Sequence, residues 1–360
     1  MIEVNSPFCR LTDLESTNGT KVNDRPASQA DLQNGDIIRG GKTLTRVRVE
    51  EEDVRTTRKQ VVPTSDSPLV KRQPANEATD GRRIGQYELA EMIGRGGVGV
   101  VHRAMRLADG QPVAIKMIRP DVETTERDIQ LFLREAEVLR NLKHPRIIRF
   151  HEINEQHGQL YFAMEYFRAP NAAALLKEDG PLSLSLAVEI ACQVLEALSY
   201  AHERRYVHRD IKPENVLVKV TEDRVETKLA DFGLARVYQT SCMSGITLQG
   251  EIGGSLAFAP PEYLTNYRDA ASAGDLYSVG AMLYTLLTGE LIYEFPESVA
   301  KAVLLVLQSD PIPISSRRSD LPEQLVKTVE RSLNRDAAKH FDSAADMRLT
   351  LLEYRQRSCG

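Results

Sequence analysis

The sequence predicts an α+β fold in which a strand-rich lobe precedes a helix-rich lobe. Runs of apolar and β-branched residues, typical of strands, occupy 98–106, 112–118 and 160–166. Apolar residues then recur with helical spacing, most clearly over 187–202 and 275–287. Strands gathered early in a chain and helices gathered later are typical of an α+β architecture rather than of alternating βα units.

The composition is that of an ordinary globular protein. The chain has 360 residues, 42% of them hydrophobic, and a net charge of −5. The negative net charge argues against a nucleic-acid partner, because proteins that bind nucleic acids carry a basic surface. Its four cysteines are scattered without metal-ligand spacing, as expected of free thiols in the cytoplasm. No apolar run approaches the length of a membrane-spanning helix, about 18 residues, and the N-terminus has no signal-peptide pattern. We therefore expect a cytoplasmic protein with no membrane span.

Three segments differ in character. Residues 1–50 have short apolar runs separated by Asn-Gly turn signals, which predicts short β-strands. Residues 51–86 are polar, rich in proline and basic side chains, and are expected to form a flexible linker. Residues 87–355 are sustained globular sequence, which we divide into an N-lobe at 87–166 and a C-lobe at 167–355.

A glycine-rich segment, Gly-Arg-Gly-Gly-Val-Gly, occupies residues 94–99 near the start of the N-lobe. Glycines let backbone N–H groups approach phosphate oxygens closely. Dinucleotide-binding folds use the same spacing, but there a helix follows the glycines at once. Here a strand pattern follows, then a turn at 108–110 and a second strand that ends at Lys116. The pattern predicts a hairpin that covers phosphates, with Lys116 paired to another charged group.

The most specific motifs are His-Arg-Asp-Ile-Lys-Pro-Glu-Asn, which ends at Asn215, and Asp-Phe-Gly, which begins at Asp231. Asp210 can accept or orient the proton of a substrate hydroxyl, and Lys212 can neutralise a phosphoryl group in transfer. Oxygens such as those of Asn215 and Asp231 are the ligands that Mg²⁺ prefers. Phosphoryl transfer needs mostly positioning and charge compensation. With Lys116, these side chains are sufficient to move the terminal phosphoryl group of ATP onto a hydroxyl.

Residues 87–355 resemble the Ser/Thr protein kinases on these motifs, and residues 96–101 and 258–262 resemble the bacterial members. The resemblance implies a two-lobed protein-kinase fold with ATP and Mg²⁺ as cofactors, Mn²⁺ as an alternative ion, and Ser or Thr of protein substrates as acceptors. The catalytic residues that it implies are Asp210, Lys212, Asn215, Asp231, Lys116 and Glu135, with Asn215 and Asp231 as metal ligands. The nucleotide-binding residues that it implies are Ile93, Gly94, Arg95, Gly96, Gly97, Val98, Gly99, Val101, Ala114, Lys116, Glu165, Phe167, Asn171 and Leu217.

The resemblance also assigns supporting roles. Glu135 is expected to pair with Lys116, and Glu137, two residues further on, is the alternative. Asp275 is expected to brace the catalytic loop. A hydrophobic stack that marks an assembled active state is expected from Leu139, Phe150, His208 and Phe232.

Two features suggest control of the activity. Arg209, beside the catalytic aspartate, is typical of kinases that are switched by a phosphate on the activation loop, and Thr247 is the favoured site of autophosphorylation. His340 stands where the family has an arginine that pairs with Glu262. Because histidine cannot make the bidentate contact of arginine, we expect a weaker and pH-sensitive contact.

Residues 11–23 and 32–38 resemble the later half of a forkhead-associated (FHA) domain, a β-sandwich that reads phosphothreonine. Asn18 would hold the backbone of the bound peptide. The arginine and serine that grip the phosphate belong to the earlier half, which has no counterpart in this sequence. A phosphothreonine peptide is therefore an expected partner only if the domain is completed upstream. For the kinase domain, a dimer is one possible state.

Overall fold

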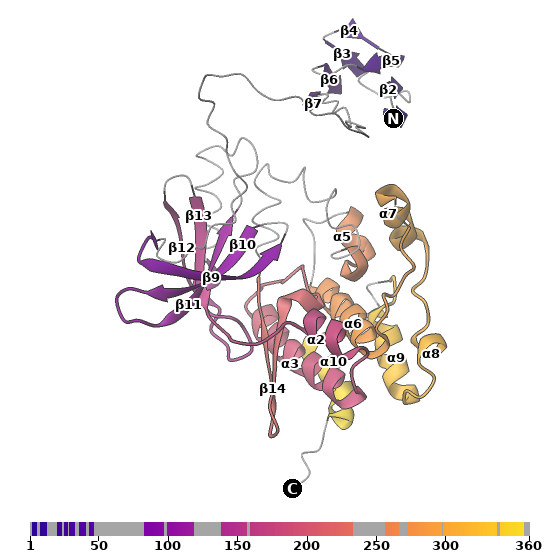
Figure 1. Cartoon of the computed structure of the whole chain (residues 1–360). Helices are drawn as coiled ribbons and strands as arrows, with labels where there is room; N and C mark the ends of the chain where they lie inside the picture. Colours follow the sequence, from indigo (N-terminus) through magenta and orange to yellow (C-terminus); the bar gives the residue numbers. More distant parts are fainter. Residues whose placement is uncertain are drawn as a thin grey trace, which may run out of the picture. The chain divides into compact units, whose positions relative to one another are not determined.

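The computed structural model of the chain comprises two units, Met1–Pro74 and Ala75–Gly360, which are considered separately below. Figure 1 shows their helices and strands. The residues that the structure describes are 2–5, 8–12, 20–23, 25–27, 29–32, 36–40, 43–46, 83–96, 99–118, 138–156, 159–232, 256–265, 272–296, 298–336 and 339–355.

The first unit contains two antiparallel sheets. A three-stranded sheet has the order β1-β2-β5, and a four-stranded sheet has the order β4-β3-β6-β7. Asn23 turns the chain after β3 with a φ of +49°, which asparagine tolerates, and donates from Nδ2 to Asp36 Oδ1 at 2.8 Å. The short strands predicted for residues 1–50 are therefore present, while Asn18 lies outside the described residues. The strands are β1 (Ile2–Asn5), β2 (Phe8–Thr12), β3 (Thr20–Val22), β4 (Arg25–Pro26), β5 (Gln29–Leu32), β6 (Ile37–Gly40) and β7 (Thr43–Arg46).

The second unit begins with a six-stranded antiparallel sheet in the order β12-β13-β11-β10-β9-β8. Its alternating apolar residues bury one face, where the rings of Tyr87 and Tyr161 meet edge to face at 6.2 Å. The three strand runs predicted for the N-lobe are confirmed. The strands are β8 (Arg83–Ile84), β9 (Tyr87–Gly96), β10 (Gly99–Arg106), β11 (Pro112–Ile118), β12 (Phe150–Gln156) and β13 (Gln159–Glu165).

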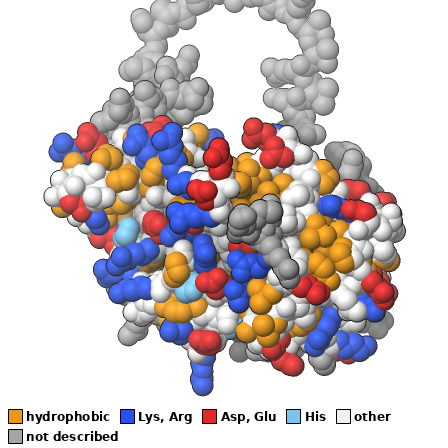
Figure 2. Space-filling model, turned by 90° about the horizontal axis from the view of Figure 1, so that it is seen from below, with side chains coloured by type: hydrophobic (Ala, Val, Ile, Leu, Met, Phe, Trp, Pro, Cys, Tyr) orange, Lys and Arg blue, Asp and Glu red, His pale blue; other side chains and the backbone are white. Residues whose placement is uncertain are grey.

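In the described residues of the C-lobe α-helices predominate, together with one hairpin, β14 (Val216–Val220) with β15 (Val225–Leu229). Basic and acidic side chains are interspersed over the face drawn in Figure 2. The α-helices are α2 (Ala172–Asp179), α3 (Leu184–Glu203), α5 (Pro261–Thr265), α6 (Ser272–Thr288), α7 (Val299–Gln308), α8 (Ile314–Arg317), α9 (Glu323–Ser332) and α10 (Ala344–Leu351). The 3₁₀ helices are η1 (Val138–Asn141), η2 (Pro213–Asn215), η3 (Leu256–Phe258) and η6 (Leu352–Tyr354).

Helices α3 and α6 form the centre of this lobe. Ser183 caps α3 by accepting a hydrogen bond from the Leu186 backbone N–H at 3.3 Å. By length and composition α3 could cross a membrane, but 61% of its most apolar window is buried inside the protein. Since it packs against α6, α10 and β15, its apolar character is explained by its place in the core.

Candidate active site

The two predicted metal ligands lie at the two ends of one hairpin. Asn215 immediately precedes β14, and Asp231 follows β15 after a single residue, Ala230. The Ala230 backbone N–H donates to the Asn215 carbonyl oxygen at 2.8 Å. Pairing of β14 with β15 therefore brings both residues together.

Asp210 is held from two sides. The Asn215 amide nitrogen donates to the Asp210 carbonyl oxygen at 2.7 Å and to its carboxylate Oδ2 at 2.9 Å. Lys212 Nζ lies 3.2 Å from the same Oδ2. Because its amide nitrogen faces Asp210, the side-chain oxygen of Asn215 points away from Asp210. This oxygen is the atom that can bind a metal ion.

Asp275 braces the catalytic loop, as predicted. Its carboxylate is fully buried and accepts from the backbone N–H groups of His208 and Arg209, both at 2.8 Å. Arg209 has a φ of +69°, which is costly for a residue with a side chain, and these bonds hold it there. His202 Nε2 lies 2.8 Å from Asp275 as a third contact. This contact could not be predicted from the sequence, because no motif includes His202, which lies near the end of α3.

His208 links the catalytic loop to the segment that carries Asp231. Its Nδ1 accepts from the Asp210 backbone N–H at 3.2 Å, so Nε2 carries the proton and donates to the Ala230 carbonyl oxygen at 2.9 Å. The ring also meets Phe232 at 4.6 Å. Phe232, Leu139 and Phe150 line one small cavity beside Asp231, so the four residues of the predicted hydrophobic stack lie in one region.

Lys116 forms its ion pair with Asp231. The Lys116 Nζ lies 2.7 Å from Asp231 Oδ2, and the lysine is only 9% exposed. Burial raises the pKa of the Asp231 carboxyl, but the charge and hydrogen bond of Lys116 outweigh it and hold that pKa below its ordinary value. The carboxylate therefore stays ionised. Glu135, the predicted partner of Lys116, lies outside the described residues.

A cavity of about 560 Å³ opens beside this cluster, a size that suits a nucleotide. The predicted residues that line it are Ile93, Gly94, Val101, Ala114, Glu165, Phe167, Asn171 and Leu217. Arg95, Gly96, Gly99 and Lys116 lie on the adjoining strands instead, while Gly97 and Val98 are outside the described residues. Asn215 and Asp231 line it as well, and the lining residues outside the predicted nucleotide-binding and metal-binding sets are Ile148, Met164, Tyr166, Arg168, Ala169, Pro170, Glu214 and Ala230.

Two lining residues are fixed by contacts of their own. Asn171 is the N-cap of α2, where its side-chain oxygen accepts from the Ala174 backbone N–H at 2.8 Å. Its amide nitrogen is thereby oriented as a donor. The Glu165 carboxylate pairs with Lys228 Nζ at 2.8 Å, and this ion pair connects β13 to the β14–β15 hairpin.

A metal ion at this site would depend on few protein ligands. Among the described residues no group of three or more His, Cys, Asp and Glu side chains converges. Asn215 and Asp231 supply two oxygens, and Mg²⁺ usually completes such a shell with water and substrate phosphates. The donor set therefore fits magnesium bound together with a nucleotide.

Gly99 has a structural role that its place in the glycine-rich segment does not reveal. A Cβ at Gly99 would overlap the Met117 carbonyl oxygen, whereas one at Gly94 would meet only Val101, at 3.7 Å. Gly99→Ala is therefore expected to lower the free energy of unfolding by about 1–3 kcal/mol. Gly94→Ala is the matched control, and equal urea midpoints for the two variants would contradict this reading.

His340 makes contacts other than the predicted one with Glu262. The ring is 3% exposed, its Nε2 contacts the Asn334 carbonyl oxygen, and its centroid lies 6.1 Å from that of Tyr277. Imidazole is shorter than an arginine side chain, and the nearby Asn334 carbonyl oxygen contacts its Nε2, while its buried Nδ1 has no hydrogen-bond partner among the described residues. The predicted weak, pH-sensitive contact with Glu262 is not among the contacts of His340 that the structure describes.

Comparison with known proteins agrees with this geometry. Residues 87–349 match the protein kinase domain and residues 1–41 match the FHA domain. The serine/threonine-protein kinase PknB of Mycolicibacterium smegmatis is 32% identical over 271 residues, which cover 74% of this chain and 42% of that protein. The chain thus spans less than half the length of this relative.

Two solved structures have a similar fold. The kinase domain of Mycobacterium tuberculosis PknI has a TM-score of 0.60 and 25% identity, covering 76% of this chain and 98% of that one. Rad53 1–466 in complex with AMP-PNP has a TM-score of 0.60 and 23% identity, covering 95% of this chain and 81% of that one.

Proposed function

Because the chain belongs to the protein kinase family, we propose that it transfers the γ-phosphoryl group of ATP to Ser and Thr hydroxyls of protein substrates. The observation that carries the proposal is the convergence of Asp210, Lys212, Asn215 and Asp231 at one edge of the 560 Å³ cavity, with Lys116 bound to Asp231. The relatives named serine/threonine-protein kinase support the same acceptor class.

Each side chain has a place in the reaction. The acceptor hydroxyl oxygen forms a bond to the γ-phosphorus while the bond to the β–γ bridging oxygen breaks, and ADP leaves. The Asp210 carboxylate orients the hydroxyl and takes its proton. Lys212 compensates charge on the phosphoryl group in transfer, and Lys116 compensates charge on the phosphates that stay with ADP. Asn215 and Asp231 would hold Mg²⁺, which neutralises phosphate charge when bound.

Phosphoryl transfer from labelled ATP tests this proposal. The wild-type chain with Mg²⁺ is expected to label itself or a generic protein substrate on Ser or Thr. Asp210→Ala is expected to lose this activity by about a hundredfold or more, because the general base is gone. It should still bind ATP, which a parallel calorimetric titration checks. Equal labelling by both proteins would show that a contaminating kinase, not this site, carries the activity.

Thr247 is the site at which we propose autophosphorylation. It lies outside the described residues, and its support is the adjacency of Arg209 to Asp210 in the sequence. Phosphopeptide mass spectrometry on the labelled wild-type chain is expected to find phosphate on Thr247. Phosphate confined to other residues would contradict the assignment.

Further expectations concern partners and location. The FHA match over residues 1–41 supports phosphothreonine recognition if the domain is complete. Anisotropy of a labelled phosphothreonine peptide, beside its unphosphorylated form, measures such binding. A cytoplasmic location is also proposed and is tested by cell fractionation. Sedimentation analysis settles whether the kinase dimerises.

A further inference from the structure

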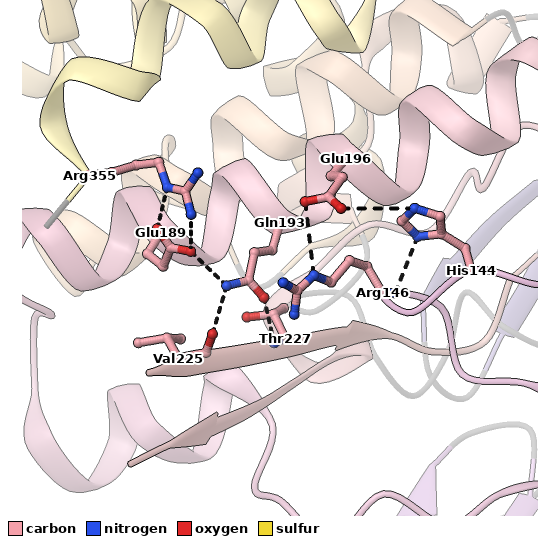
Figure 3. A network of polar contacts seen from close by, with 8 residues as sticks. All are labelled: His144, Arg146, Glu189, Gln193, Glu196, Val225, Thr227 and Arg355. Atoms are coloured by element: carbon pink, nitrogen blue, oxygen red, sulfur yellow. Dashed lines mark hydrogen bonds and ion pairs between the residues drawn. The ribbon is translucent and has the colours of Figure 1, made fainter. Parts of the chain in front are cut away.

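Helix α3 carries a row of polar side chains along one of its faces. Glu189, Gln193, Glu196 and Tyr200 follow one another at intervals of four, three and four residues, so they share one face of the helix. Gln193 is only 2% exposed. Figure 3 shows that Glu189 and Gln193 take part in one polar network beside β15, while Glu196 contacts Arg146 and His144 separately. A buried glutamine must satisfy its amide, and what it contacts here is the backbone of the hairpin.

Gln193 occupies the outer edge of β15 as a neighbouring strand would. Its Nε2 donates to the Val225 carbonyl oxygen at 2.8 Å, and its Oε1 accepts from the Thr227 backbone N–H at 2.7 Å. The opposite edge of β15 pairs with β14. Further along the outer edge, the Leu229 N–H donates to the Arg146 carbonyl oxygen at 2.8 Å. The loop at Arg146 pairs with only part of this buried strand edge. The side chain of Gln193 therefore supplies the hydrogen-bond partners for the rest of it.

Glu189 and Arg355 fix which way the Gln193 amide faces. The Gln193 Nε2 also donates to Glu189 Oε1, at 2.7 Å. A carboxylate can only accept, so the amide nitrogen faces Glu189 and the oxygen is left for Thr227. Arg355 holds Glu189 through both oxygens, with Nη2 at 2.7 Å from Oε1. Burial raises the pKa of Glu189, but the hydrogen bonds from Arg355 and Gln193 outweigh it and keep the carboxyl ionised.

The hairpin to which Gln193 is hydrogen-bonded is the one that has Asn215 and Asp231 at its two ends. We propose that Arg355, Glu189 and Gln193 form a positioning relay that sets the separation and orientation of these two magnesium ligands. The inference rests on the proposed kinase function. Arg355 lies just beyond η6, so the relay would connect the chain that follows α10 with the catalytic centre. None of the three residues touches substrate, and each acts through the backbone of β15.

A purely stabilising role would have different consequences. Loss of the relay would then lower the melting temperature while magnesium and ATP bind the folded protein as before. A positioning role instead predicts weaker magnesium binding in protein that is still folded. Residues that orient metal ligands from behind typically change metal affinity or activity by about 10–100-fold when they are replaced.

The test measures ATP binding to the full chain by calorimetry at increasing Mg²⁺ concentration. Gln193→Met keeps the length of the side chain but leaves the Thr227 N–H and the Val225 carbonyl unpaired. It is expected to raise the Mg²⁺ concentration for half-maximal ATP binding by about tenfold. Arg355→Ala is expected to act in the same direction. Arg355→Lys keeps the charge but cannot make the bidentate contact, and its effect is expected to be smaller. Adenosine, which needs no metal, should bind all of them like wild type.

Controls separate the outcomes. Arg106→Ala removes another bidentate pair, with Asp109 at 2.9 and 2.7 Å, and is expected to leave the Mg²⁺ dependence unchanged. Hydrogen exchange at the Thr227 amide is expected to accelerate in Gln193→Met and Arg355→Ala but not in Arg106→Ala. Unchanged Mg²⁺ dependence in Arg355→Ala and Arg355→Lys would overturn the relay, whatever their melting temperatures. Wild-type protein that binds Mg²⁺ and ATP without transferring phosphate would instead overturn the proposed function.

Discussion

Asp231→Asn is expected to reduce the rate of phosphoryl transfer by about a thousandfold, among the largest effects of any substitution at the site. The change removes a negative charge that both the metal and Lys116 need. Asparagine has nearly the same shape and tolerates positive φ, so the backbone at +58° can be kept. The loss should therefore appear in kcat measured on folded protein. Asp223→Asn, on the exposed turn between β14 and β15, is the matched control.

The same variant has a defined pH signature. The folded pKa of Asp231 is lower than its ordinary value of 3.8, so the carboxylate contributes stability above that pH. This contribution is lost as the pH falls through the lower folded pKa. Unfolding free energies of wild type and Asp231→Asn are thus expected to differ at neutral pH and to converge below about pH 3.8. A difference that stays constant down to acid pH would contradict the ion pair with Lys116.

Asp275→Ala is expected to lower the free energy of unfolding by about 3–5 kcal/mol and to abolish activity. The buried backbone N–H groups of His208 and Arg209 would lose their acceptor, and His202 would lose its carboxylate. Without these bonds the left-handed backbone at Arg209 loses two of the contacts that offset its strain. Chemical denaturation measures the loss of stability.

Two further variants make this expectation specific. Asp275→Asn can still accept one of the hydrogen bonds and should fall between wild type and alanine. Asp320→Ala removes a carboxylate that is 69% exposed and should cost little. An Asp275→Ala protein as stable as Asp320→Ala would show that the catalytic loop is held by other contacts.

Much of the site could be predicted because local patterns specify it. The glycine-rich hairpin follows from strand signals on both sides of the glycines, and Asp210, Asn215 and Asp231 occur in motifs with fixed spacing. The bracing role of Asp275 also followed from its motif. The glycine-rich hairpin and the two motifs depend on residues that lie close together in sequence. Asp275 lies 66 and 67 positions from the Arg209 and His208 backbone groups that it holds, and its role was predicted from the resemblance alone.

The remaining contacts join residues that are far apart in the sequence, so no short motif indicates them. Gln193 reads as one polar residue in an apolar helix, and nothing near it in sequence indicates that it binds β15. Arg355 and Glu189 pair across 166 positions. For His340 the resemblance predicted a contact with Glu262, which stays a prediction, and nothing in the sequence indicated that its Nε2 would contact the Asn334 carbonyl oxygen.

The β14–β15 hairpin has a consequence for the order in which the protein folds. Asn215, Asp210 and Asp231 are brought together by short-range pairing, which closes small loops and forms within microseconds to milliseconds in small domains. The contact of Lys116 with Asp231 spans 115 positions and joins the strand-rich lobe to the helical one, so its loop-closure entropy is larger, although this cost grows slowly with loop length. Pairing of β14 with β15 should therefore precede the contact of Lys116 with Asp231, which forms when the two lobes dock.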